Sequence, residues 1–149
     1  MSERLPYAKN FRELIAYEKS RRLARDVFAI SRSFPKEETY SLPDQVRRSS
    51  RAIGANIAEA WEKRAYEKHF VSKLTDADAE QYETQHWLEI SIDCAYASQA
   101  SIGPLISSCE EIGRILGGMI ARSEQFCKPL AIREPLAEYF AGNKGEPDE

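Results

Sequence analysis

The sequence has few of the residues that metal centres, disulfide bonds and catalytic thiols or imidazoles require. Its 149 residues include two histidines and three cysteines, Cys94, Cys109 and Cys127. An odd number of cysteines without a C-x-x-C pair argues against a disulfide framework and against a cysteine zinc site. We therefore expect reduced thiols, with Cys94 and Cys109 as inert core residues, and we predict no metal and no cofactor.

Long apolar runs are also absent. No stretch approaches the roughly 18 consecutive apolar residues of a membrane-spanning helix. The N-terminus lacks the charged start and apolar middle of a secretory signal. Hydrophobic residues make up 42% of the chain and charged residues 30%, which is the balance of a globular protein. These features predict a cytoplasmic protein with no membrane partner.

Alternating runs of β-branched residues are missing too, whereas apolar residues recur at spacings of three and four in four segments. This periodicity predicts an all-α fold, an antiparallel up-down-up-down four-helix bundle. We expect an N-terminal extension over 1–10, the bundle over 11–126 and an irregular tail over 127–149, with one helical turn at 134–140. The predicted helices cover 11–33, a segment from 42 with Ser41 as its N-cap, 66–97, and a segment that follows a break at 99–104.

Each predicted helix has a main stripe that should face the core, and in the first helix a second stripe, Tyr17, Ala24 and Phe28, should widen that face. The four stripes are Ala16, Ser20, Leu23, Val27 and Ile30; Leu42, Val46, Ser49, Ile53, Asn56 and Ala60; Phe70, Leu74, Ala77, Gln81, Thr84, Leu88, Ser91 and Ala95; and Leu105, Cys109, Ile112, Leu116 and Met119. Small residues crowd the second helix between Ser49 and Ala60, including Gly54, and they predict close approach of a facing helix.

Polar residues interrupt these stripes, and a buried polar group needs a hydrogen-bond partner. We predict an interhelical network of Asn56, Glu59, Gln81 and Thr84 that fixes helix register. A small polar pocket lined by Asn56, Glu59 and Arg48 is the alternative.

The pair Glu83-x-x-His86 has the spacing of half a di-iron site in a helical bundle. The other histidine, His69, has no acidic residue at the matching position, so the second half of such a site is missing. The rival to a scaffold function is therefore a ligand- or metal-binding bundle that uses Asn56, Glu59, Glu83 and His86. We expect His86 instead to pack beside Trp87.

Charge is distributed unevenly along the chain. Residues 1–73 contain 16 Lys and Arg against 10 Asp and Glu, while residues 74–149 contain 5 against 14. Either a basic surface binds RNA or DNA, or the opposite charges meet between helices or subunits. No aromatic platform is evident among the basic residues. The candidate nucleic-acid-binding residues are Arg21, Arg22, Arg25, Arg47, Arg48, Arg51, Lys63 and Arg64.

Several segments resemble a known family. These are FREL at 11–14, YSL at 40–42, QVRRS at 45–49, ANIAE at 55–59 and ETQHWL at 83–88. Together they resemble the four-helix-bundle family that includes the 23S ribosomal RNA intervening-sequence proteins, over about residues 11–126. This chain departs from the family pattern where Gly54 replaces a proline and Ala60 a glycine.

The resemblance implies a cytoplasmic homopentamer, and most members have no established biochemical activity. Related bundles include accessory proteins of diversity-generating retroelements, which bind nucleic acid and have a reverse transcriptase as protein partner. We therefore predict a non-enzymatic, homo-oligomeric scaffold. Its leading functional refinement is association with RNA or DNA through the basic helix faces.

Overall fold

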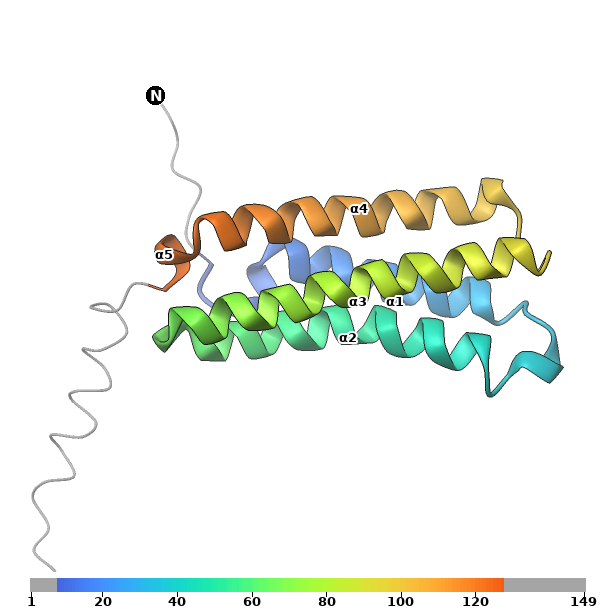
Figure 1. Ribbon diagram of the computed structural model, residues 1–149, viewed down its shortest axis with the longest axis horizontal. Coiled ribbons are helices and arrows are strands. Elements are labelled where there is room, and N and C mark those ends of the chain that lie inside the picture. The colour runs from blue at the N-terminus through green and yellow to red at the C-terminus, as the bar shows by residue number, and fades with distance from the viewer. Residues whose placement is uncertain (1–7, 128–149) are drawn as a thin grey trace, which may run out of the picture.

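The structure is a computed structural model that describes residues 8–127, and within this range it contains four long helices and no strand. The predicted all-α four-helix bundle is confirmed (Figure 1). The long helices are α1 (Ile15–Ser31), α2 (Leu42–Glu62), α3 (Glu67–Asp93) and α4 (Gln99–Ala121). Shorter elements are α5 (Ser123–Phe126) and the 3-10 turns η1 (Phe11–Glu13), η2 (Lys36–Glu38) and η3 (Lys63–Ala65).

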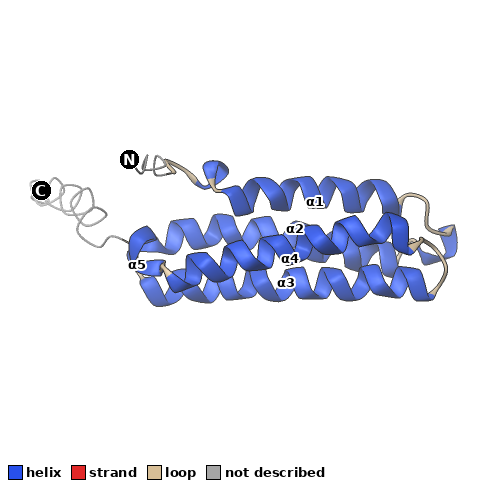
Figure 2. Cartoon of the chain, turned by 90° about the horizontal axis from the view of Figure 1, so that it is seen from above, coloured by secondary structure: helices blue, strands red, loops and turns tan. Residues whose placement is uncertain are grey.

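The four rods lie lengthwise side by side, and successive helices run in opposite directions (Figures 1 and 2). α2 packs against α1 and α3, and α4 packs against α3 and α1, which closes the bundle. The described chain begins and ends at the same end of the bundle, beside α5 (Figure 1). Within residues 8–127, no helix combines the length and the hydrophobicity that crossing a bilayer demands.

The core is built from the stripes that the sequence predicts. Helical spacings of three and four bring these residues onto one face of each rod, and nearly all of them are buried. The exceptions are Ile30, Asn56 and Leu105, which are half-buried, and Ala95, which is exposed. Gly54 provides the expected close approach, because a Cβ there would lie 2.9 Å from Ser20 Oγ of α1.

The first two helices begin differently from the sequence expectation. Asn10 Oδ1 accepts a hydrogen bond from the Arg12 amide at 2.9 Å and closes a separate 3-10 turn, so α1 starts at Ile15. Ser41 occupies the N-cap position of α2 as predicted, but its side chain makes no capping bond. Glu38 Oε2 accepts from the Leu42 amide at 3.4 Å instead.

The predicted break before the fourth helix is wrong, since α4 already begins at Gln99 and contains Pro104. Ser98 is extended, and its hydroxyl accepts from the Ser101 amide at 3.2 Å, as an N-cap does. A proline removes one helical N–H bond and is tolerated best near a helix start. The Ser98 cap thus sets the start of α4, and Pro104 falls inside the helix.

α3 ends at Asp93, four residues before the predicted end, because the chain turns sharply at Ala95. Ala95 has a φ of 59°, the left-handed conformation in which helices often terminate. The amides of Tyr96 and Ala97 donate back to the Ser91 carbonyl at 2.9 and 3.3 Å and satisfy the end of the helix. A glycine or asparagine usually fills such a position, so the sequence carries no visible stop signal here.

We expect Ala95→Gly to raise the free energy of unfolding by about 0.5–1 kcal/mol, because glycine has no Cβ to strain the left-handed backbone. Urea denaturation followed by circular dichroism measures the change. Ala79→Gly is the matched control, since Ala79 is an exposed position in the interior of α3. There, glycine should cost about 1 kcal/mol. Equal losses at both positions would contradict the role assigned to Ala95.

The cysteines differ in their surroundings. Cys109 and Cys127 are buried, and burial raises the pKa of Cys109 to about 12 and that of Cys127 to about 11. Cys94 is exposed at the end of α3, so the expectation that it is a core residue is wrong. The early end of α3 explains the error, because Cys94 follows the last helical residue.

We therefore expect an aromatic disulfide reagent at pH 8 to modify one thiol per native chain rapidly and three after denaturation. The thiolate is the reacting species, and Cys109 and Cys127 are both covered and poorly ionised. Absorbance of the released thiolate counts the reacted groups. Cys94→Ser should abolish the fast phase, and a fast phase that survives this substitution would refute the assignment.

Candidate functional site

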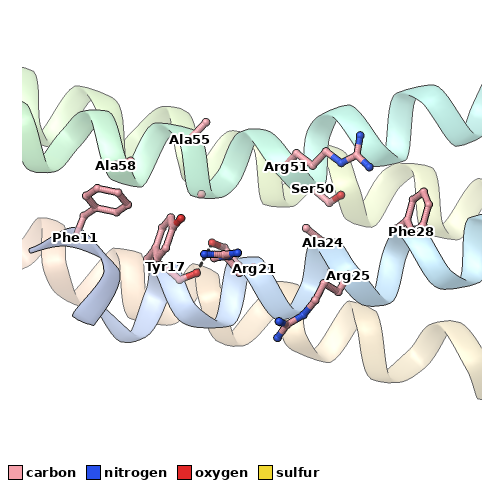
Figure 3. A pocket seen from close by; sticks show the side chains of 12 residues that line it. Phe11, Tyr17, Arg21, Ala24, Arg25, Phe28, Ser50, Arg51, Ala55 and Ala58 are labelled. Carbon is pink, nitrogen blue, oxygen red and sulfur yellow. Dashed lines mark hydrogen bonds between the residues drawn. The ribbon is translucent and has the colours of Figure 1, made fainter.

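An open groove of about 500 Å³ lies between α1 and α2. We call it the α1/α2 groove. Short side chains from both helices leave the space unfilled, while aromatic and basic side chains stand beside them (Figure 3). Its principal lining residues are Tyr17, Ala24, Phe28, Arg51, Ala55 and Ala58.

The groove is open because the small residues of α2 divide between two roles. Ser50 and Gly54 are buried against α1, whereas Ala55 is exposed and Ala58 half-buried. The small-residue segment thus packs closely only on the side that faces the core. No other helix of the described chain covers Ala55 and Ala58. Their short side chains make this side of the groove shallow and apolar.

Phe28 stands at one end of the groove with three guanidinium groups around it. The Cζ atoms of Arg47, Arg51 and Arg32 lie 4.9, 5.8 and 5.9 Å from its ring centroid. The phenyl ring is 41% exposed. Arg47 is held in place because its Nε donates to Ser31 Oγ at 2.7 Å. We call these four residues, Phe28, Arg32, Arg47 and Arg51, the Phe28 cluster.

The Phe28 cluster corrects the expectation that no aromatic residue accompanies the arginines. Phe28 and Arg32 come from α1 and the turn after it, whereas Arg47 and Arg51 come from α2. No local sequence motif brings them together. The available signal was the second apolar stripe of α1, Tyr17, Ala24 and Phe28, which faces the groove and not the core.

Two more arginines border the groove on its α1 side. Arg21 and Arg25 are both exposed, and the Arg21 Cζ lies 6.0 Å from the Tyr17 ring centroid. None of the arginines at positions 21, 25, 32, 47 and 51 forms an ion pair with a carboxylate of the described chain. Their charge is therefore available to an external anion.

Arg48 behaves differently from its neighbours, because it turns toward α3. Its guanidinium lies 3.3 Å from Glu80 and 2.5 Å from Glu83. The hydrogen bond from Arg48 holds the pKa of Glu83 below its ordinary value, and burial raises the pKa of Glu80. The alternative in which arginines pair with α3 carboxylates thus holds for Arg48, which links α2 to α3 and leaves the candidate anion-binding set.

The remaining basic candidates are scattered. Arg22 lies 3.9 Å from Glu18 at an exposed position. Arg64 Cζ lies 3.4 Å from the Trp61 ring centroid, and its Nε donates to the Trp61 carbonyl at 2.8 Å. Lys63 is exposed in η3. The structure therefore places Arg21, Arg25 and Arg51 on the α1/α2 groove and Arg47 beside Phe28 at its end, and it separates the other four.

The four residues of the predicted polar network are not joined. Thr84 Oγ1 donates to Ser49 Oγ at 2.9 Å and so links α3 to α2, as an interhelical bond was expected to do. Gln81 is buried but bonds within its own helix, to Asp78 at 2.9 Å and to Gln85 at 2.7 Å.

Asn56 and Glu59 lie at the edge of the α2 stripe and do not reach Gln81 or Thr84. Asn56 Nδ2 donates to the Ala52 carbonyl at 3.0 Å within its own helix. Glu59 is exposed and pairs with Lys73 at 2.8 Å, which lowers the pKa of this carboxyl. Of the four residues, Thr84 and Glu59 link α3 and α2, each through a partner outside the predicted network, Ser49 and Lys73.

The rival ligand or metal site is not assembled either. Glu83 is engaged by Arg48 and by Trp87 Nε1, which donates to it at 3.3 Å. His86 is exposed, and its ring lies edge-on to Trp87 with centroids 4.7 Å apart, as predicted. Within residues 8–127, no three His, Cys, Asp or Glu side chains converge on a point that would hold a metal ion.

Comparison with known proteins decides the family. Residues 12–118, most of the bundle, match the family model described as 23S rRNA-intervening sequence protein. The chain belongs to this family. The resemblance drawn from the five short segments is confirmed.

Among solved structures, the chain is similar to a protein of unknown function from the S23 ribosomal protein family of Bacteroides thetaiotaomicron VPI-5482. The two are 28% identical with a TM-score of 0.66, over 72% of this chain and 96% of the other. No curated protein matches the chain. The fold is thus shared with the Bacteroides protein, whose description names no activity.

Proposed function

We propose that this protein is a non-enzymatic scaffold that binds nucleic acid through the α1/α2 groove and the Phe28 cluster. The observation that carries the proposal is a set of arginines without carboxylate partners in the described chain: Arg21, Arg25 and Arg51 line the groove, and Arg32 and Arg47 lie beside Phe28 at its end. Arginine suits phosphate through its planar fork of donors.

A salt titration of nucleic-acid binding tests this proposal. Each phosphate that is neutralised on a single strand contributes about −0.7 to the slope of log K against log salt concentration. Three to five contacts would therefore give a slope of roughly −2 to −3.5. Absence of binding to RNA and DNA at low salt would refute the proposal.

We also propose that the protein assembles into a homo-oligomer in the cytoplasm, with five subunits by analogy with the family. Charge complementarity supports self-association. The α3/α4 side has an acidic hollow with Glu89, Ile92, Asp93 and Ile106, which can meet exposed cations outside the α1/α2 groove, such as Lys63. When two different surfaces of identical subunits bind head to tail, the subunits form a closed ring if the rotation between neighbours divides evenly into a full turn. Light scattering that shows only a 17.0 kDa monomer at micromolar concentration would refute the oligomer.

A further inference from the structure

We propose that Phe28 is a stacking platform for an unpaired base, and that the α1/α2 groove takes single-stranded RNA or DNA in preference to duplex. This inference rests on the proposed function and adds the kind of strand that the groove accepts. RNA and DNA share the two features that the site addresses, a planar base and a phosphate.

The surroundings of Phe28 carry the inference. A phenyl ring that is 41% exposed stands among three guanidinium groups, all within 6 Å of its centroid and none paired with a carboxylate of the described chain. Single-strand-binding proteins stack bases on aromatic rings and on arginine planes, with cations that follow the backbone. Phe28 and its arginines supply both elements in one place.

The groove continues from Phe28 along α1 in a way that suits a strand. Phe28 and Tyr17 are eleven residues apart, which is about 16 Å of helix. Arg25 and Arg21 lie between them on the α1 border, while Ala24 and the α2 alanines keep the floor apolar and low (Figure 3). A strand with one base on Phe28 therefore has further cations for its next phosphates.

A duplex fits these features poorly. Paired bases expose only their edges, because their faces are covered by the neighbouring pairs, so Phe28 has nothing on which to stack. The hollow next to the groove includes one carboxylate, Asp44, beside Arg47, Arg48 and Arg51. The net charge around Phe28 is therefore positive. A positive surface attracts a nucleic acid, which carries one negative charge per phosphate, more strongly than it attracts a protein helix with few charges.

The experiment compares Phe28→Leu and Phe28→Trp with the unaltered full-length protein. The probes are a ten-nucleotide single-stranded RNA, the DNA strand of the same sequence, and the corresponding duplexes, measured by fluorescence anisotropy over a range of salt. Tyr82→Leu is the matched control, because Tyr82 is 63% exposed on α3, away from the groove. Circular dichroism establishes that each variant is folded.

We expect the unaltered protein to bind single strands at least tenfold more tightly than duplexes. Phe28→Leu should weaken single-strand binding roughly 5- to 150-fold, the range for loss of one base–aromatic stack. Its salt slope should stay unchanged, because no cation is lost. Phe28→Trp should bind at least as well as the unaltered protein, and Tyr82→Leu should bind like it.

The outcomes separate the two proposals. Binding of no nucleic acid at low salt removes the proposed function and this inference together. Binding with equal affinity for single strand and duplex, or without an effect of Phe28→Leu, removes the inference alone. A Phe28→Leu variant that changes the oligomeric state and leaves affinity intact would assign the groove to a second copy of the chain and would also overturn the inference.

Discussion

Phe70→Ala is expected to lower the free energy of unfolding by about 3–5 kcal/mol, the usual cost of removing a buried phenyl ring. Phe70 is 0% exposed and is the largest fully buried side chain of the described residues. Its ring stacks on that of Phe126 with centroids 5.7 Å apart, so it also ties the turn α5 to α3. Domains are typically stable by about 5–15 kcal/mol, which makes this loss a large share.

Urea denaturation followed by far-ultraviolet circular dichroism measures the loss. Tyr82→Ala is the control, because it removes an aromatic ring of similar size from the same helix at a position that is 63% exposed. We expect a change of about 0.5 kcal/mol or less there. Similar losses from both substitutions would mean that the Phe70 end of the bundle is not packed as described.

The double substitution Arg25→Gln with Arg51→Gln is expected to weaken single-strand binding roughly 10- to 50-fold at about 0.1 M salt. The two arginines border the α1/α2 groove from opposite helices, and neither has a carboxylate partner in the described chain. If each neutralises one phosphate, the salt slope should become less steep by about 1.4. Both side chains are exposed, so the fold should tolerate the change.

The matched control is Arg114→Gln with Arg122→Gln, which removes the same charge from exposed positions in and after α4. This pair should alter the salt slope by less than half as much. Equal effects from the two double variants would show that binding follows net charge alone and that the groove has no special part in it.

The fold could be predicted because helical periodicity acts through many residues at once. Each core stripe contains several residues on the same helix face, so no single residue decides whether a helix is predicted. Examples from the four stripes are Leu23, Ile53, Leu74 and Ile112. Individual boundaries depend on one or two residues and are less secure. The left-handed turn at Ala95 and the cap at Ser98 are such cases, because each depends on a few local hydrogen bonds that act against the ordinary preferences of alanine and proline.

The candidate site was predicted only in part, since its members lie on different helices. The arginines of α2 were recognisable as a cluster, but the sequence does not say which of them turns toward α3. Arg48 meets Glu80 and Glu83, whereas Arg47, one residue earlier, is rotated about 100° around the helix and meets Phe28. Only the positions of α1 and α3 beside α2 show which arginine forms ion pairs within the protein and which can bind an external anion.

Because the number of long helices is even, the two ends of the bundle differ: both ends of the described chain lie at one of them. Because the described chain enters and leaves at one pole, the opposite pole consists only of the turns between α1 and α2 and between α3 and α4, where Cys94 lies (Figure 1). A dye or spin label attached through that sulfur would sit at the pole opposite residues 8 and 127, the two ends of the described chain. It would therefore offer a single reporter for following assembly and ligand encounters without truncating the chain.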